Sequence, residues 1–149
     1  MNWPVNSSRT QIRLLHLEDD PWFRCLLEAA LGLYGAPCDV MPVESVCDAI
    51  AALNSCLNEG AVLPDLLLLD LKLGDGDGLE VLHFAKWHPV LARIPTVMLG
   101  AELPPEVVQA ALGLGASACW IKPKHPDSLR EIAGRLLGLL QVTPAMQAV

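Results

Sequence analysis

Three acidic side chains and one lysine follow apolar segments that lie far apart in the sequence. Glu18 and Asp19 follow one such segment, Asp70 ends a second, and Lys122 follows a third. If these segments are neighbouring parallel strands, their carboxyl ends meet at one edge of a sheet, where ligands bind in open α/β folds. We therefore expect three carboxylates and one ammonium group to share a pocket.

Such a cluster of carboxylates needs a counter-ion, because like charges at this spacing repel by on the order of a few kcal/mol in a partly desolvated site. Mg²⁺ is the first candidate, since it is a hard cation that prefers oxygen ligands. Together with the ammonium group of Lys122, it would neutralise the oxygens of an incoming phosphoryl group. The cluster therefore suits phosphoryl transfer, with the central carboxylate, Asp70, as nucleophile.

Short apolar runs alternate with segments of helical apolar spacing along the whole chain. We expect strands at residues 12–17, 38–43, 65–70, 94–99 and 118–121, and helices at 21–33, 44–57, 79–87, 105–112 and 126–140. The run 66–69 is entirely apolar, which is typical of a strand buried on both faces of a parallel sheet. With right-handed crossovers, this alternation indicates a three-layer α/β sandwich.

The length and composition indicate one globular domain over residues 12–140, with flexible tails at 1–11 and 141–149. Hydrophobic residues make up 52% of the chain and charged residues 18%. A net charge of −7 argues against a nucleic-acid surface. No leader is visible, and the uncharged stretch 110–121 is far shorter than the ~20 residues that span a bilayer. We expect a cytoplasmic protein.

Several residues that resemble metal ligands have simpler interpretations. Asp20 precedes a proline, as a helix cap does, and Asp75 and Asp77 suit a solvated turn. A calcium loop at this turn is excluded by Leu79 and Lys86, which stand where ligands are needed. The four histidines show no ligand spacing, and the cysteines contain no CxxC pair, so we interpret the cysteines as reduced core thiols. These are Cys25, Cys38, Cys47, Cys56 and Cys119.

Three groups of motifs resemble the receiver domain of two-component response regulators. They are LEDDP at 17–21, DLLLLD at 65–70 with DGLE at 77–80, and GAS at 115–117 leading to KP at 122–123. Their order and spacing match over about residues 12–140. The resemblance implies a (βα)5 doubly wound parallel sheet of the flavodoxin-like kind, with strand order 2-1-3-4-5, in a signalling domain rather than an enzyme.

The resemblance also implies a role for each site residue. Asp70 would be the phosphoacceptor, Asp19 a direct Mg²⁺ ligand and Glu18 a ligand through water. The backbone carbonyl of Lys72 would complete the coordination. Lys122 would pair with Asp70 and then with a phosphoryl oxygen, its direction fixed by a cis peptide bond to the proline that follows.

Two positions depart from the family pattern. Gly100 stands where a Ser or Thr hydroxyl normally bonds the phosphoryl group, and Cys119 stands where an aromatic side chain normally swings inward. A hydrogen bond to a charged group contributes roughly 1.5–3 kcal/mol, so the phosphorylated state loses one contact. We expect phosphorylation to be retained and its usual coupling to the face formed by the fourth helix, fifth strand and fifth helix to be weakened.

Two charged side chains are expected to tune hydrolysis. Lys72 lies two residues after the acceptor, and Glu102 two residues after Gly100; in the family, side chains at these positions flank the path of attacking water. Their opposite charges would allow them to pair across the pocket mouth and hinder in-line water, so we predict a longer-lived phosphoaspartate than in a Lys72→Ala variant.

The leading hypothesis is a single-domain receiver that takes a phosphoryl group from a histidine kinase or phosphotransfer protein. Its output would be contact with an unidentified downstream protein, and a homodimer through the last two helices is possible. The alternative is a degenerate receiver that serves as an interaction module uncoupled from phosphorylation. An aspartyl phosphatase is disfavoured, because such enzymes need a second carboxylate where this chain has Lys72.

Overall fold

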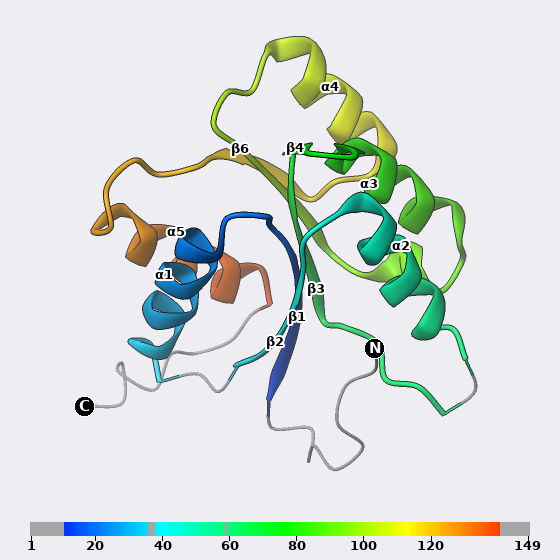
Figure 1. Cartoon of the computed structure of the whole chain (residues 1–149), viewed down its shortest axis with the longest axis horizontal. Coiled ribbons are helices and arrows are strands. Elements are labelled where there is room, and N and C mark those ends of the chain that lie inside the picture. Colours follow the sequence, from blue (N-terminus) through cyan, green and yellow to red (C-terminus); the bar gives the residue numbers. More distant parts are fainter. Residues whose placement is uncertain (1–10, 36–37, 59, 141–149) are drawn as a thin grey trace.

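The computed structural model describes residues 11–35, 38–58 and 60–140. These residues form a parallel five-stranded sheet with helices on both faces (Figure 1). The strands are β1 (Ile12–Leu17), β2 (Cys38–Val43), β3 (Leu66–Asp70), β6 (Thr96–Gly100) and β7 (Ala118–Ile121). The helices are α1 (Pro21–Gly32), α2 (Val46–Ser55), α3 (Gly78–Trp87), α4 (Pro105–Leu114) and α5 (Ser128–Leu139), with a short 3₁₀ turn at Leu91–Arg93.

The strand order is β2-β1-β3-β6-β7, which confirms the predicted 2-1-3-4-5 order of the flavodoxin-like fold. Figure 1 shows α1 and α5 on one face of the sheet and α2, α3 and α4 on the other. An additional hairpin, β4 (Lys72–Leu73) with β5 (Gly76–Asp77), follows the central strand. Its strands are too short to show an apolar pattern, so the sequence predicted only a loop there.

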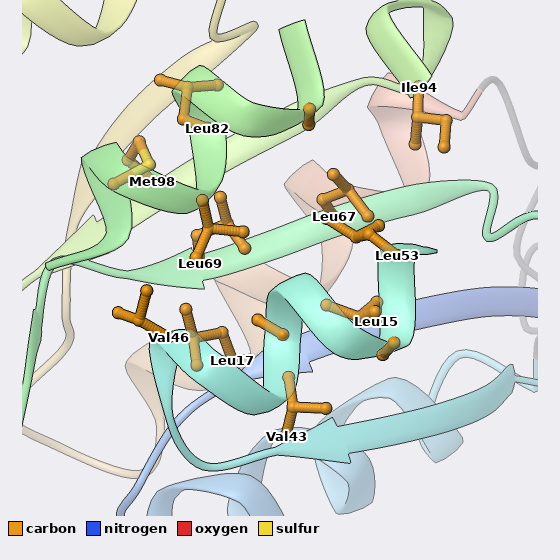
Figure 2. Close-up of a cluster of buried hydrophobic side chains, with 14 of the residues drawn as sticks. Leu15, Leu17, Val43, Val46, Leu53, Leu67, Leu69, Leu82, Ile94 and Met98 are labelled. Carbon is orange, nitrogen blue, oxygen red and sulfur yellow. The ribbon is translucent and has the colours of Figure 1, made fainter. Parts of the chain in front are cut away.

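Side chains of the central strand alternate between two hydrophobic clusters. Leu67 and Leu69 lie in the cluster beneath α2 and α3, shown in Figure 2, whereas Leu66 and Leu68 lie in the cluster beneath α1 and α5. All four are fully buried, which contributes roughly 1.5–3 kcal/mol for each side chain. Burial on both faces explains why this strand is an uninterrupted apolar run.

Side-chain caps set several helix ends. Asp20 accepts a hydrogen bond from the Trp22 amide (3.0 Å), and Asp77 caps α3 by accepting from the Glu80 amide (3.3 Å). The predicted start of α2 at residue 44 is wrong by two positions, because Ser45 caps the helix. None of the helices within the described residues is long and apolar enough to cross a membrane.

Other boundaries differ from prediction by a few residues. The last helix begins at Ser128 rather than 126, with Asp127 as its N-cap, and α4 extends to Leu114, where Gly115 (φ 110°) ends it. All five cysteines are free thiols, but the prediction that all are in the core is wrong. Cys25 and Cys47 are exposed on α1 and α2, since the apolar faces of these helices point elsewhere. The predicted tails lie outside the described residues, apart from residue 11.

Candidate functional site

The parallel register brings the carboxyl ends of β1, β3 and β7 to one edge of the sheet. Leu17 pairs with Leu69, so the residues that follow β1 lie beside Asp70. On the other side of β3, the Lys122 amide donates a hydrogen bond to the Gly100 carbonyl (2.9 Å). One carboxylate oxygen from each of three residues lies within 4.8 Å of the others; these residues are Glu18, Asp19 and Asp70.

Lys122 makes ion pairs with two of these carboxylates. Its Nζ lies 2.6 Å from Oε1 of Glu18 and 3.1 Å from Oδ2 of Asp70. The ammonium group also lies over the ring of Phe23, 4.9 Å from the ring centroid. The sequence indicated a pairing with Asp70 only, so the shorter contact with Glu18 is new information from the structure.

Burial shifts the protonation equilibria of this cluster. Glu18 is fully buried and Asp70 is 6% exposed, whereas Asp19 is exposed. Burial raises the pKa of Glu18 to about 7, and the negative charge of Asp70 adds to this, while Lys122 opposes it. For Lys122, burial favours the neutral amine, but the hydrogen bond to Glu18 and the charge of Asp70 outweigh it and raise its pKa.

The residues present fit a divalent cation. Three ionised carboxylates and one ammonium group leave an excess of two negative charges, which a divalent cation would neutralise. All the side-chain donors are carboxylate oxygens, the ligand type that Mg²⁺ prefers. The exposed Asp19 side chain leaves the cluster accessible from solvent. Glu18, Asp19 and Asp70 are the residues that would hold the ion.

A pocket of about 340 Å³ opens beside Asp70 and Lys122. Lys72 and Glu102 both line it, as expected for side chains at its mouth, but no ion pair joins them. The predicted pairing of these two residues is therefore wrong for this state of the protein. Long exposed side chains of opposite charge lose side-chain entropy when they pair, which offsets most of the Coulomb attraction.

Gly78 allows α3 to begin directly against the acceptor strand. A Cβ atom at this position would collide with the backbone carbonyl oxygen of Asp70, so only glycine fits. The Gly78 amide donates a hydrogen bond to the Leu71 carbonyl (2.7 Å). The Asp-Gly pair at 77–78 thus combines a helix cap with a close approach to the site.

The segment after β6 folds back against Gly100. A Cβ atom there would lie 2.9 Å from the Glu102 carbonyl oxygen and 2.9 Å from Cδ2 of Leu103. A side chain is therefore excluded from this position unless the segment moves. Cys119, the other departure from the family pattern, is half-buried in β7 and packs against the cluster beneath α2 and α3.

The cis peptide bond expected between Lys122 and Pro123 is wrong, because the described part of the chain contains no cis peptide bond. The trans form is the more stable one for most X-Pro bonds, by about 0.5–1 kcal/mol. The direction of the Lys122 side chain is instead set by its two carboxylate partners.

Two neighbours of the cluster were not predicted to lie at the site. His16 is buried in β1 with its ring against Phe23 (6.1 Å between ring centroids), and burial, with Lys122 and Arg24 nearby, lowers its pKa to about 3. Arg24 donates to the Glu18 carbonyl (3.2 Å) and to Oε1 of Glu44 (2.9 Å). No local pattern distinguishes Arg24 from other helical arginines, because its partners lie on two different loops.

The fold is a flavodoxin-like α/β module, and the acid–lysine cluster at the carboxyl ends of its strands is a candidate cation site. The family profile described as the response regulator receiver domain matches residues 14–133. The chain therefore belongs to the response-regulator receiver family, whose members are signalling domains of two-component systems.

Similar proteins support this assignment. The transcriptional regulatory protein TrcR of Mycobacterium tuberculosis is 35% identical over 130 residues, covering 87% of this chain and 46% of TrcR. KdpE of Staphylococcus aureus is 31% identical over 120 residues, covering 80% of this chain and 47% of KdpE. The chain thus spans less than half the length of these relatives.

Solved structures show the same fold. The phosphorylated cyanobacterial phytochrome response regulator RcpA superposes with a TM-score of 0.77 at 28% identity, covering 87% of this chain and 93% of RcpA. The Mn²⁺-bound response regulator Rcp1 gives a TM-score of 0.76 at 26% identity, covering 87% of this chain and 94% of Rcp1.

Proposed function

We propose that this receiver accepts a phosphoryl group on Asp70, with Mg²⁺, from a histidine kinase or a histidine phosphotransfer protein. The observation that carries the proposal is the position of Lys122, which contacts Glu18 and Asp70 at the edge of the acid cluster. The similar receivers RcpA and Rcp1 were solved phosphorylated and Mn²⁺-bound, respectively, which supports the same chemistry here.

In the proposed reaction, a carboxylate oxygen of Asp70 attacks the phosphorus of a phosphohistidine. The new O–P bond forms as the P–N bond breaks, and the donor imidazole keeps the electron pair and takes up a proton. Bound Mg²⁺ would supply positive charge for the phosphoryl oxygens. Lys122 binds a further phosphoryl oxygen from the pocket beside Asp70.

The remaining residues have supporting roles in this proposal. Asp19, which is exposed, would hold the cation directly, and Glu18, which is buried, would hold it through water. The backbone carbonyl of Lys72 would be a further ligand. The side chains of Lys72 and Glu102 flank the path of attacking water from the pocket wall.

The signal would leave this cytoplasmic protein through contact with another protein. The packing of Glu102 and Leu103 against Gly100 favours a second candidate function, a receiver used as an interaction module. In that case the acid cluster stays intact, but phosphorylation of Asp70 does not change the conformation of any surface far from the site.

Acetyl phosphate tests the proposed function. With Mg²⁺, we expect the intact mass of the protein to increase by one phosphoryl group, in a bond that base cleaves. This increase in mass should be absent in Asp70→Asn, and also in the wild type when a chelator removes Mg²⁺. Asp20→Asn is the matched control, because Asp20 is an adjacent exposed acid that caps α1. A wild-type protein that gains no mass, or a gain that persists in Asp70→Asn, would exclude Asp70 as phosphoacceptor.

A further inference from the structure

The carboxylate of Asp75 binds the first two amides of α2. Asp75 lies in the turn of the β4–β5 hairpin, and it accepts hydrogen bonds from the Val46 amide at Oδ1 (2.9 Å) and the Cys47 amide at Oδ2 (3.0 Å). These amides have no partner inside the helix, and the sequence predicted only a solvated turn here. A residue 28 or 29 positions away in the chain therefore completes the N-terminus of α2.

This contact fixes the segment that leaves the acceptor strand. The hairpin begins at Lys72, two residues after Asp70, and its strands pair only Lys72 with Asp77 and Leu73 with Gly76. Two-residue strands are too short to hold a fixed position by themselves. The hydrogen bonds that Asp75 accepts from the α2 amides anchor the tip of the hairpin. They thereby orient the backbone at Lys72, which lines the pocket.

The same helix end connects back to the acid cluster. Glu44, which precedes the cap of α2, forms an ion pair with Arg24 (2.9 Å), and Arg24 donates to the Glu18 carbonyl (3.2 Å). The loops after β1, β2 and β3 are thus joined through Arg24, Glu44 and Asp75. The hydrogen bonds that the Val46 and Cys47 amides donate to Asp75 lower the pKa of its carboxyl group. The carboxylate therefore remains charged at the positive end of the helix dipole.

We propose that Asp75 is a positioning residue of the cation site: it holds the hairpin against α2 and thereby sets the backbone of Lys72 beside Asp70. This inference rests on the proposed function in one respect, namely that the acid cluster binds Mg²⁺. Because coupling between two sites is reciprocal, Mg²⁺ binding must in turn strengthen the contact between Asp75 and α2.

Calorimetric titration with Mg²⁺ alone tests the role of Asp75. We expect Asp75→Ala to weaken Mg²⁺ binding about tenfold, as for other residues that support metal ligands. Asp75→Asn keeps one acceptor oxygen, so its loss should be smaller. Ser45→Ala is the matched control: the Ser45 hydroxyl caps the same helix by accepting from the Asp48 amide (3.0 Å), whereas the hydrogen bonds to the hairpin come from Val46 and Cys47. It should lower stability and leave Mg²⁺ affinity within about twofold of wild type.

Amide hydrogen exchange provides a readout that a purely structural cap would not change. Mg²⁺ should slow exchange at Val46 and Cys47 in the wild type and in Ser45→Ala, but not in Asp75→Ala. Equal losses of Mg²⁺ affinity in Ser45→Ala and Asp75→Ala, or an unchanged affinity in both Asp75 variants, would overturn the inference. A wild-type protein that binds no Mg²⁺ would instead contradict the proposed function.

Discussion

At the scale of single residues, Lys122 connects the two buried carboxylates of the acid cluster. Its Nζ lies closer to Glu18 (2.6 Å) than to Asp70 (3.1 Å), so it acts as the counter-ion of a buried carboxylate. A cation held beside Glu18 and Asp70 would compete with the ammonium group for the negative charge of these two carboxylates. Cation binding would therefore release Lys122 from Glu18 and leave it available to a phosphoryl group.

This competition predicts opposite effects of one substitution. Lys122→Met should bind Mg²⁺ several-fold more tightly at pH 8.5, because the ammonium group would repel a cation held by the same carboxylates, and two positive charges about 4 Å apart repel by roughly 1 kcal/mol or more. The same variant should be phosphorylated by acetyl phosphate at least about tenfold more slowly, since it lacks the group that pairs with a phosphoryl oxygen. Titration calorimetry and mass spectrometry measure the two effects.

Lys124→Met is the control for this prediction, because Lys124 is exposed and makes no ion pair in the described structure. It should match the wild type in both measurements. Weaker Mg²⁺ binding by Lys122→Met would show that the ammonium group does not compete with the cation.

At the scale of elements, the segment after β6 determines whether a side chain fits at position 100. The missing side chain leaves no free space, because the Glu102 carbonyl and the Leu103 side chain occupy it. Replacing Gly100 with the hydroxyl residue of the family therefore requires this segment to move. A serine or threonine at position 100 would therefore also require a different packing of Glu102 and Leu103.

Gly100→Ser should therefore destabilise the protein by about 1–3 kcal/mol, the usual cost of overpacking. Urea denaturation followed by circular dichroism measures this loss. Leu103→Ala should recover part of it in the double variant, because one of the two close contacts disappears. Gly113→Ser is the control, since a Cβ atom there meets no atom within 4 Å. A Gly100→Ser protein as stable as the wild type would contradict this packing argument.

At the scale of the whole molecule, the buried His16 links stability to pH. Its pKa is about 3 in the folded protein, against 6.5 for an exposed histidine, and burial is the main cause. Below pH 6.5 the unfolded chain binds a proton that the folded protein does not. Stability from this residue is therefore complete above pH 6.5 and decreases as the pH falls toward 3.

His16→Leu should remove this dependence, because leucine extends the apolar cluster that contains Leu14 and Leu68. Between pH 7 and pH 5, the wild type should lose about 2 kcal/mol of unfolding free energy relative to the variant, at 1.36 kcal/mol for each pH unit. Urea denaturation at both pH values measures the difference. Glu18 contributes with the opposite sign, because its raised pKa favours the folded state at lower pH.

Comparison with the variant cancels the Glu18 contribution as long as the pKa of Glu18 is the same in both proteins. His125→Gln is the control, since His125 is exposed, and it should follow the wild type. If His16→Leu and the wild type lose the same stability on acidification, His16 does not carry the effect.

The sequence by itself determined the features that depend on local order. Uninterrupted apolar runs predicted the strands, Asp20 and Asp77 predicted helix starts, and the acids at strand ends predicted one cluster, because parallel strands place their carboxyl ends at one edge. The departure at Gly100 was also visible without coordinates.

Only the tertiary structure decided which distant groups touch. The ion pair between Lys122 and Glu18 joins residues 104 positions apart (122 − 18). The hydrogen bond from the Val46 amide to Asp75 joins the start of α2, which follows β2, to the hairpin that follows β3. The filled space beside Gly100 and the separation of Lys72 from Glu102 likewise depend on how loops pack. Such contacts have no local pattern, since their geometry is set by the packing of helices against both faces of the sheet.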